Sequence, residues 1–229
     1  MKRGPSNYHP KIVDGSAPNN DRLYRNNGDH TFTNVTNEAG IVYEGYGLGL
    51  AIADINLDGW PDIFVGNDYV TNDLVYINNQ DGTFSNQAKN FLKHQSRFSM
   101  GCDVSDINND GLDDIYLSAN QKSDRLYLNL GNLKFKDITE EAGIKMDSTW
   151  SSGVTMEDVN NDGFLDIYVS KVGNYKVLKA HNLLYINKGD NSFTESSKVY
   201  GIDFSGLSTQ ASFFDYDNDG DLDMYLLNH

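Results

Sequence analysis

Four short segments of this 229-residue sequence place oxygen-bearing side chains at a fixed spacing that suits a metal ion. The spacing is D-x-[ND]-x-D-G-x-x-D, with Asp or Asn at positions 1, 3, 5 and 9 and Gly at position 6. The four sets are Asp54, Asn56, Asp58 and Asp62; Asp106, Asn108, Asp110 and Asp114; Asp158, Asn160, Asp162 and Asp166; and Asp215, Asp217, Asp219 and Asp223. Short side chains at alternate positions of a tight turn converge on one point, and the glycine permits the turn.

Calcium is the ion that fits this donor set best. It accepts roughly six to eight oxygen ligands in flexible geometry, whereas magnesium requires a stricter octahedron and keeps more of its water. Water and a backbone carbonyl at position 7 would complete each shell. The residues at position 7 are Trp60, Leu112, Phe164 and Asp221. We therefore expect about four calcium sites, with the tightest in the fourth loop, which alone has Asp at position 3.

Two other interpretations of the loops, an EF-hand and a simple tight turn, are less consistent with the sequence. An EF-hand also requires a bidentate Glu at position 12 and flanking helices, but position 12 is apolar in every loop. The residues there are Val65, Leu117, Val169 and Leu226. The second interpretation is that Asp, Asn and Gly are present in these loops only because they favour tight turns. Carboxylates crowded identically into four turns repel one another, so turn formation alone does not account for them.

The composition excludes several function classes. The chain has 33 acidic and 18 basic residues, a formal charge of −15, and Asp supplies 27 of the acids. A nucleic-acid partner is not expected, because such domains normally carry a basic face. The single cysteine, Cys102, excludes an internal disulfide and a multi-cysteine zinc site. No apolar run approaches the roughly 18 residues of a membrane span, and the N-terminal residues lead into no signal-like stretch.

The acidic loops belong to a repeat of about 50 residues. The first loop residues, from Asp54 to Asp215, are 52, 52 and 57 residues apart. A second series alternates with them: LYRNNGDHTF from Leu23, VYINNQDGTF from Val75, LYLNLGNLKF from Leu126 and LYINKGDNSF from Leu184. Apolar residues alternate before each loop, a short apolar run follows it, and the Tyr-containing segment and a Phe-containing segment come next. Each unit therefore predicts four short strands, and no helix of normal length.

Four-stranded units of this period favour an all-β fold, a β-propeller with four calcium-loop repeats. The G-H and W-D signatures of WD40 repeats are missing. A β-sandwich is the alternative, but it would not explain the period. Residues 1–20 are expected to be a loosely ordered lead-in, and residues 21–229 to form three full blades and two complementary half-blades.

The two half-blades leave the closure of the propeller open. The chain enters at a third strand and leaves after a second strand, so the halves could complete one blade and give a closed four-bladed ring, which would be a monomer. The alternatives are part of a larger propeller, or self-association of copies through open sheet edges.

One insertion accounts for the 57-residue spacing. It spans residues 171–180 and carries Lys171, Tyr175, Lys176 and Lys179. Alternating strand directions place it at the end of the blades opposite the calcium loops, which share their end with the Asn- and Gly-rich turns. It is interpreted either as a partner-contact loop or as a solvated insertion.

Catalytic signatures are lacking, and the chain is not expected to be an enzyme. No G-x-S-x-G, H-E-x-x-H or glycine-rich phosphate loop is present. The histidines, His9, His30, His94, His181 and His229, do not pair at ligand spacing. Cys102 is interpreted as a buried thiol in a first strand. An aromatic row eight residues before the loops could stack on sugars or lie in the core; it comprises Tyr46, Phe98 and Trp150, with Leu207 in the fourth position.

The loops and the repeat resemble FG-GAP/VCBS repeats, the calcium-bearing propeller blades of integrin α subunits and many bacterial surface proteins. The stretches FFDYDNDGDLDMYLLNH and FKDITEEAGI are similar to the bacterial cartilage-acidic-protein-like group, which is often joined to ASPIC/UnbV domains. The resemblance covers about residues 21–229. It departs from the family in two respects, since family propellers usually have about seven blades and this sequence carries no ASPIC/UnbV segment.

The resemblance and the loops together predict a calcium-stabilised, non-enzymatic binding or adhesion scaffold. Its expected location is extracellular, at the cell surface or in the periplasm, although this sequence has no signal peptide. A carbohydrate-binding lectin and an accessory domain of a polysaccharide lyase or hydrolase are the alternatives. The partner would be a protein or a glycan that the sequence does not name.

Overall fold

A computed structural model describes residues 11–69, 71–91 and 98–229. Residues 1–10 of the expected lead-in and His94 lie outside the described residues. The N-terminal half-blade has β1 (Tyr24–Asn26) and β2 (Phe32–Asn34), and the C-terminal half-blade has β15 (Ser208–Phe214) and β16 (Asp223–Asn228). Blade 1 has β3 (Gly47–Ala53), β4 (Asp62–Asn67), β5 (Leu74–Asn78) and β6 (Phe84–Asn86), and blade 2 has β7 (Ser99–Ser105), β8 (Asp114–Ala119), β9 (Arg125–Asn129) and β10 (Phe135–Asp137). Blade 3 has β11 (Ser151–Glu157), β12 (Asp166–Lys171), β13 (Leu183–Asn187) and β14 (Phe193–Glu195).

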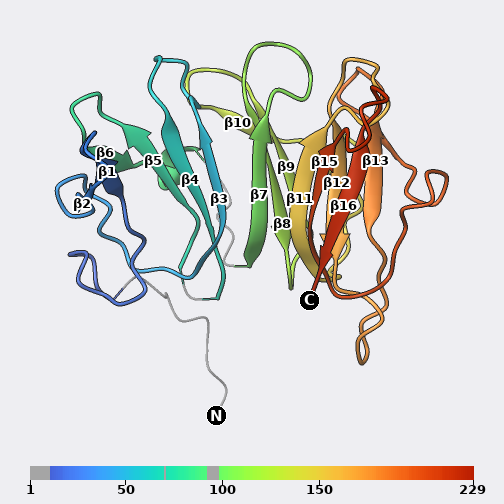
Figure 1. The fold of residues 1–229 in the computed structure, drawn as a ribbon, viewed down its shortest axis with the longest axis horizontal. Helices are drawn as coiled ribbons and strands as arrows, with labels where there is room; N and C mark the ends of the chain where they lie inside the picture. The colour runs from blue at the N-terminus through green and yellow to red at the C-terminus, as the bar shows by residue number, and fades with distance from the viewer. Residues whose placement is uncertain (1–10, 70, 92–97) are drawn as a thin grey trace.

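The predicted all-β propeller architecture is confirmed. Three four-stranded antiparallel sheets follow one another, and a two-stranded sheet stands at each end of the row. Figure 1 shows these sheets side by side, fanning out from their first strands. In the part of the chain that the structure describes, the only helix is α1 (Ala88–Phe91), and no helix is long and apolar enough to span a membrane.

Apolar clusters between neighbouring sheets hold the row together. The second strands β8 and β12 are buried along their whole length, because a blade or half-blade lies on each face. Between blades 1 and 2, Phe64 packs in one cluster with Ile115 and Leu117. The corresponding cluster between blades 2 and 3 contains Tyr116 and Ile167. The core therefore lies between blades, as expected for units that cannot bury both faces alone.

Glycines let the first strands come close to one another. The strand β7 contacts both β3 and β11, and β11 contacts β15. A Cβ atom on Gly101 would lie 3.1 Å from the Cα of Gly153, and one on Gly153 would clash with the carbonyl oxygen of Thr209. Any side chain there would push the next blade away, so these positions favour glycine.

The row is open, and the expected pairing of the two half-blades is not formed. In the described chain β1 pairs with β2 and β15 pairs with β16, each in a sheet of its own. The half-blades lie at opposite ends of the row (Figure 1). The closed four-bladed ring is therefore absent from this structure, because packed clusters at the blade junctions keep the two ends apart.

One residue of the predicted insertion is buried instead of exposed. Lys171 does not project into solvent with the loop: it is the last residue of β12 and only 3% exposed. Its ammonium lies beside the buried carboxylate of Asp124 of the preceding blade and beside hydroxyl groups at the start of its own blade, described below. Tyr175 and Val177 are exposed, and the ammonium of Lys176 lies 4.9 Å from the ring centroid of Tyr175.

Candidate metal-binding loops

Each acidic loop connects the first and second strands of a blade and folds as the same hydrogen-bonded turn. In the first loop, Asp54 at position 1 accepts the backbone N–H groups of Asp58 and Gly59 at 3.0 and 2.8 Å. Gly59 has a φ of +86°, which explains the glycine at position 6. The same two bonds form in the other three loops, to Asp106, Asp158 and Asp215. The repeated geometry places the first ligand candidate identically four times.

The aspartate at position 9 begins the second strand and is buried in the complete blades. Asp62, Asp114 and Asp166 are at most 1% exposed. Asp62 accepts N–H groups from Ile55 of its own loop at 3.1 Å and from Asn78 at 2.8 Å. Equivalent bonds hold Asp114 and Asp166. Each of these carboxylates is therefore fixed in direction before any ion binds.

Burial makes these three carboxylates hard to ionise. It raises the pKa of Asp62, raises that of Asp114 to about 7 and raises that of Asp166 to about 6, against the pull of the two N–H donors. The carboxylates at positions 1 and 5 of the same loop raise the pKa further. A divalent cation would offset both effects, so the donor chemistry of the loops fits calcium.

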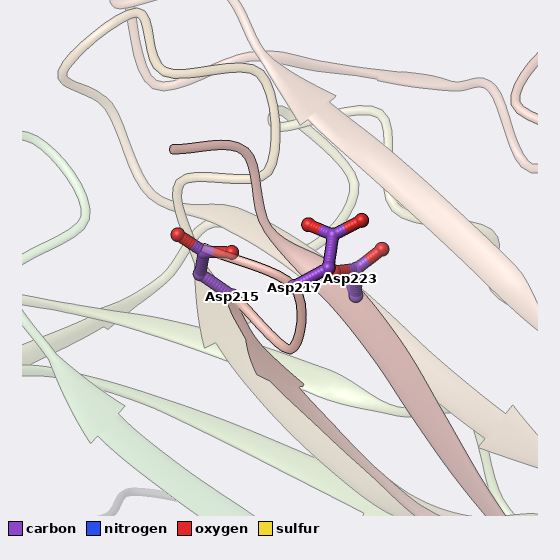
Figure 2. A group of neighbouring side chains, drawn as sticks. All are labelled: Asp215, Asp217 and Asp223. Carbon is purple, nitrogen blue, oxygen red and sulfur yellow. The ribbon is translucent and has the colours of Figure 1, made fainter. Parts of the chain in front are cut away.

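The fourth loop brings three carboxylates together. Asp215, Asp217 and Asp223, at positions 1, 3 and 9, have oxygen atoms within 4.8 Å of one another (Figure 2). Among the described residues, no second group of three acidic, histidine or cysteine side chains comes so close. Positions 1, 5 and 9 thus do not converge in the first three loops, where position 3 is an asparagine.

The remaining predicted ligands lie in the turns but have other contacts. The position-5 carboxylate accepts the N–H of position 7, as Asp58 does from Trp60 at 2.9 Å. In the first three loops it also accepts the side-chain amide of position 3, from Asn56 at 3.0 Å in the first loop. The equivalent contacts involve Asn108, Asp110 and Leu112, then Asn160, Asp162 and Phe164, and, for the N–H bond alone, Asp219 and Asp221. Participation of positions 5 and 7 in metal binding stays a prediction.

Three asparagines at the ends of the third strands were missed as part of the site. Asn78, Asn129 and Asn187 donate their backbone N–H groups to the position-9 carboxylates. The amide of Asn187 also donates to Ile107 of the preceding blade at 2.8 Å. The signal was present in the sequence, because Asn recurs two residues after the Tyr of every third strand. Its partner is in another motif, so local spacing did not reveal it.

A second repeated polar contact joins the blades at the end opposite the loops. Asp73 accepts the N–H of Asn67 at the end of β4 and the hydroxyl of Ser99 at the start of β7. Asp124 accepts the N–H of Ala119 and the hydroxyl of Ser151 in the same way. Asn182 accepts the N–H of Lys171 and donates its side-chain amide to the hydroxyl of Ser208. Each contact therefore ties a second strand to the first strand of the next blade.

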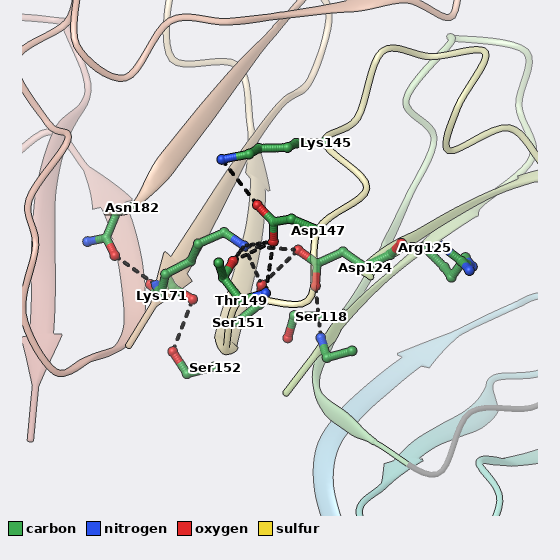
Figure 3. A network of polar contacts seen from close by, with 12 residues as sticks. Ser118, Asp124, Arg125, Lys145, Asp147, Thr149, Ser151, Ser152, Lys171 and Asn182 are labelled. Carbon is green, nitrogen blue, oxygen red and sulfur yellow. Dashed lines mark hydrogen bonds and ion pairs between the residues drawn. The ribbon is translucent and has the colours of Figure 1, made fainter. Parts of the chain in front are cut away.

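Blade 3 adds a buried ammonium to this contact (Figure 3). Lys171 donates to the hydroxyls of Thr149 and Ser151 at 2.8 and 2.9 Å, and lies 3.9 Å from Asp124 and 3.6 Å from Asp147. Burial raises the pKa of Asp124, and Lys171 acts against that effect. For Asp147 burial is outweighed by Thr149 and Lys171, which lower its pKa to about 2. The cluster is an internal ion-pair network, and no chemistry is assigned to it.

Cys102 and the aromatic row have structural surroundings. Cys102 was interpreted as a buried thiol, and the structure places it as partly buried. Burial, with Asp103 nearby, raises the pKa of its thiol to about 12, so the thiolate is disfavoured. Tyr46 and Trp150 are 52% and 37% exposed just before the first strands. They therefore lie outside the core, and Phe98 and Leu207 are partly buried.

Comparison with known proteins places these features in a family. A model described as an FG-GAP-like repeat matches residues 12–65, 54–117, 106–169 and 176–226. Cartilage acidic protein 1 from Homo sapiens is 28% identical over 199 residues, covering 84% of this chain and 30% of that protein. Integrin alpha-8 from Gallus gallus is 30% identical over 164 residues, covering 64% and 15%. The chain thus spans less than a third of the length of these relatives.

A solved structure of an Agrocybe aegerita lectin, described as recognising non-reducing terminal N-acetylglucosamine, is similar in fold. The TM-score is 0.51 at 21% identity, covering 89% of this chain and 53% of the lectin chain. The likeness concerns the arrangement of strands. Because the repeat model matches nearly the whole chain, and does so in register with the acidic loops, the chain belongs to the FG-GAP-like repeat family.

Proposed function

We propose that this chain is a calcium-stabilised, non-enzymatic binding scaffold for adhesion outside the cytoplasm. The observation that carries the proposal is the acidic turn that recurs at the same end of successive blades, with a buried carboxylate at position 9. Kinship with integrin alpha chains and cartilage acidic protein supports an adhesive role and an extracellular or cell-surface location. The partner would be a protein or a glycan.

Calcium would be held by the side chains at positions 1, 3, 5 and 9, with the carbonyl at position 7. When bound, the ion supplies positive charge that neutralises the clustered carboxylates. The protein's own part is to fix the turn through the N–H groups at positions 5 and 6, and to orient the position-9 carboxylate through two further N–H donors. Metal binding would thereby couple the loop to the first, second and third strands of its blade.

Thermal unfolding with and without calcium tests the proposal. An ion that binds only the folded state adds RT ln(1 + [Ca]/Kd) per site, about 2.7 kcal/mol at a hundredfold excess over Kd. The midpoint should rise with calcium, rise less with magnesium and fall with chelator. A midpoint that is the same in calcium and in chelator would refute calcium stabilisation.

A lectin is the second candidate. The exposed rings of Tyr46 and Trp150 at the end opposite the loops offer the flat apolar surfaces on which sugars stack, and the similar fold belongs to a lectin. A glycan array that includes oligosaccharides ending in N-acetylglucosamine tests this candidate. Silence across the array would remove it and leave a protein partner.

A further inference from the structure

The two ends of the row expose apolar side chains at positions that are buried, or in the case of Cys102 partly buried, inside it. On the second strands, Phe64, Tyr116 and Tyr168 are at most 1% exposed, whereas the equivalent Tyr225 of β16 is 64% exposed. On the first strands, Val154 and Ala211 are 3% and 4% exposed, whereas the equivalent Leu50 of β3 is 66% exposed. Among the described residues, no complete blade lies against the outer face of β16 or against the outer face of β3.

Inside the row, the aromatic side chain of each second strand packs onto the next blade. Phe64 joins Ile115 and Leu117 of blade 2. Tyr168 joins Ala211 of the C-terminal half-blade and meets Phe213 edge-on, with ring centroids 5.8 Å apart. Tyr225 therefore has the position of a side chain that inserts into a following blade.

Blade 1 has a cavity where such a side chain would insert. The cavity has a volume of about 360 Å³ and is lined by Leu23, Leu50, Ile52, Ile63, Val65 and Tyr76, among others. An apolar cavity of about 150 Å³ already accepts benzene. The surrounding cluster contains Leu23, Val65 and Tyr76 but no aromatic residue from a second strand of a preceding sheet. The equivalent cluster between blades 1 and 2 has Phe64 in that role.

Backbone N–H donors and side-chain acceptors at the two ends are complementary as well. In the complete blades, an asparagine N–H at the end of the third strand donates to the position-9 carboxylate; the bonds are Asn78 to Asp62, Asn129 to Asp114 and Asn187 to Asp166, at 2.8, 2.7 and 2.8 Å. In the half-blades the corresponding residues are Asn26 and Asp223. Among the described residues, the carboxylate of Asp223 accepts only the N–H of Tyr216.

A second complementary pair lies at the other end of the same strands. Inside the row, an Asp or Asn before the third strand accepts the N–H at the end of the second strand; the bonds come from Asn67 to Asp73, from Ala119 to Asp124 and from Lys171 to Asn182. The corresponding residues in the half-blades are Asp21 and Asn228. In the described chain, the partly buried carboxylate of Asp21 accepts no hydrogen bond.

We propose that the C-terminal half-blade of one copy completes a blade with the N-terminal half-blade of a second copy, head to tail. The strand β16 pairs with β1 of the other copy, Met224 opposite Tyr24, and Tyr225 enters the cavity against blade 1. The Asn26–Asp223 and Asp21–Asn228 bonds form at the same time. The joint repeats the register that Ile63 and Tyr76 have inside blade 1.

A second copy fits better than the chain's own C-terminus. The half-blades lie at opposite ends of the row (Figure 1), and joining them within one chain would change the packing at every blade junction. A head-to-tail contact between copies closes into a ring or continues as a chain of copies.

Light scattering after size exclusion tests the proposal on the 229-residue chain. From about 1 to about 100 µM, the mass should rise to two copies or more. Tyr225→Ser at one end and Leu50→Asn at the other should each weaken self-association at least about tenfold. Both residues are exposed, so both variants should fold, which circular dichroism checks. Val199→Ser is the matched control, at an apolar residue that is 86% exposed in the connection between β14 and β15, outside both half-blades; this variant should assemble as the parent does.

Mixing the two variants distinguishes this joint from other arrangements. The Tyr225→Ser chain keeps an intact N-terminal end, and the Leu50→Asn chain keeps an intact C-terminal end. An equimolar mixture should therefore form a one-to-one heterodimer that neither variant forms alone. A parent that stays monomeric at every concentration would overturn the proposal, and a lower melting point of monomeric Tyr225→Ser would then indicate closure within one chain. Assembly that persists in both variants would overturn it too.

Discussion

At the scale of single residues, the position-9 aspartates decide what the loops do. Asp62, Asp114 and Asp166 are buried, and each is held by two backbone N–H donors. Two such bonds do not compensate for the lost hydration, and the pKa of all three carboxyl groups is therefore raised. These three carboxylates are thus desolvated and fixed in direction, and a cation beside them would favour their ionised form.

The residue at position 3 should determine which loop binds calcium most tightly, because it is an asparagine in the first three loops and an aspartate in the fourth. Asp217→Asn removes the carboxylate that distinguishes the fourth loop, and the number of charged ligands tunes the Kd of calcium sites over decades. We expect the tightest Kd in a calorimetric titration to rise by roughly tenfold. Asp190→Asn, in an exposed turn outside the acidic loops, is the control. Unchanged binding by Asp217→Asn would contradict the ranking.

Without calcium, burial of Asp114 should make stability fall as the pH rises. Its folded pKa is about 7 and its unfolded pKa about 3.9, so the folded state holds a proton that the unfolded state has lost. The stability of the metal-free protein is therefore highest below about pH 4 for this group and decreases up to about pH 7. Asp114→Asn removes this contribution.

Urea unfolding in chelator at pH 5 and pH 8 measures the effect. The parent should lose more stability between the two values than Asp114→Asn loses, while Asp166 contributes equally to both proteins. Excess calcium should reduce the difference, since it binds the ionised carboxylate. Identical losses in parent and variant would show that Asp114 does not titrate in this range.

At the scale of elements, polar contacts between strands of neighbouring blades set the junctions. Each Asp or Asn before a third strand caps a second strand and binds a serine of the next first strand. At the junction of blades 2 and 3, Lys171 adds an ammonium among Asp124, Asp147 and two hydroxyls. A junction with buried charges depends on all partners being present.

Lys171→Met should destabilise the protein strongly. Removing one partner of a buried ion pair costs about 3–5 kcal/mol, because the other charge is left buried without compensation. Lys145→Met is the control: its ammonium is 3.1 Å from Asp147, but its side chain is 56% exposed, so the cost should stay below about 1 kcal/mol. Urea unfolding measures both.

A double variant separates charge from packing in the same experiment. Adding Asp124→Asn to Lys171→Met removes the uncompensated carboxylate, so part of the lost stability should return. If Lys171→Met costs no more than Lys145→Met, or if the second change recovers nothing, the ion pair does not stabilise this junction.

At the scale of the whole molecule, the spacing of blades depends on glycines in the first strands. A Cβ on Gly49 would lie 2.9 Å from the backbone nitrogen of Cys102, and Gly101 and Gly153 are equally confined. At each of the three positions a backbone atom of the next blade lies within 3.1 Å of the Cβ position, and a backbone atom cannot rotate away. The three glycines therefore determine how closely neighbouring blades meet.

Gly153→Ala should cost at least about 3 kcal/mol, at the upper end of overpacking, because its methyl group would force β15 away from β11. Gly201→Ala is the matched control: nothing lies within 4 Å of its Cβ position, but its φ is +73°, so we expect a cost of about 1 kcal/mol from backbone strain alone. Thermal unfolding of both variants checks the difference. Equal costs would mean that the blades can separate without loss.

Most of the fold was predictable, because the signals are local and repeated. The alternation before each loop, the apolar run after it and the Tyr-containing segment correspond to the first, second and third strands of the described blades. Lys171 was misplaced for a physical reason: a lysine at the start of a polar insertion normally stays in water, and its buried partner Asp124 lies in another repeat. The position-9 donors were missed for the same reason, since Asn187 and Asp166 are 21 residues apart.

The sequence by itself determined the repeat, the four-stranded blade and the acidic turn, because each is built from local motifs of about ten residues that recur along the chain. Only the tertiary structure decided that the row stays open, that Lys171 is buried and that Tyr225 and Leu50 are exposed at its two ends. The same residue types are covered inside the row and uncovered at its ends. What covers a side chain is a neighbouring blade, and no local pattern in the sequence states whether that neighbour is present.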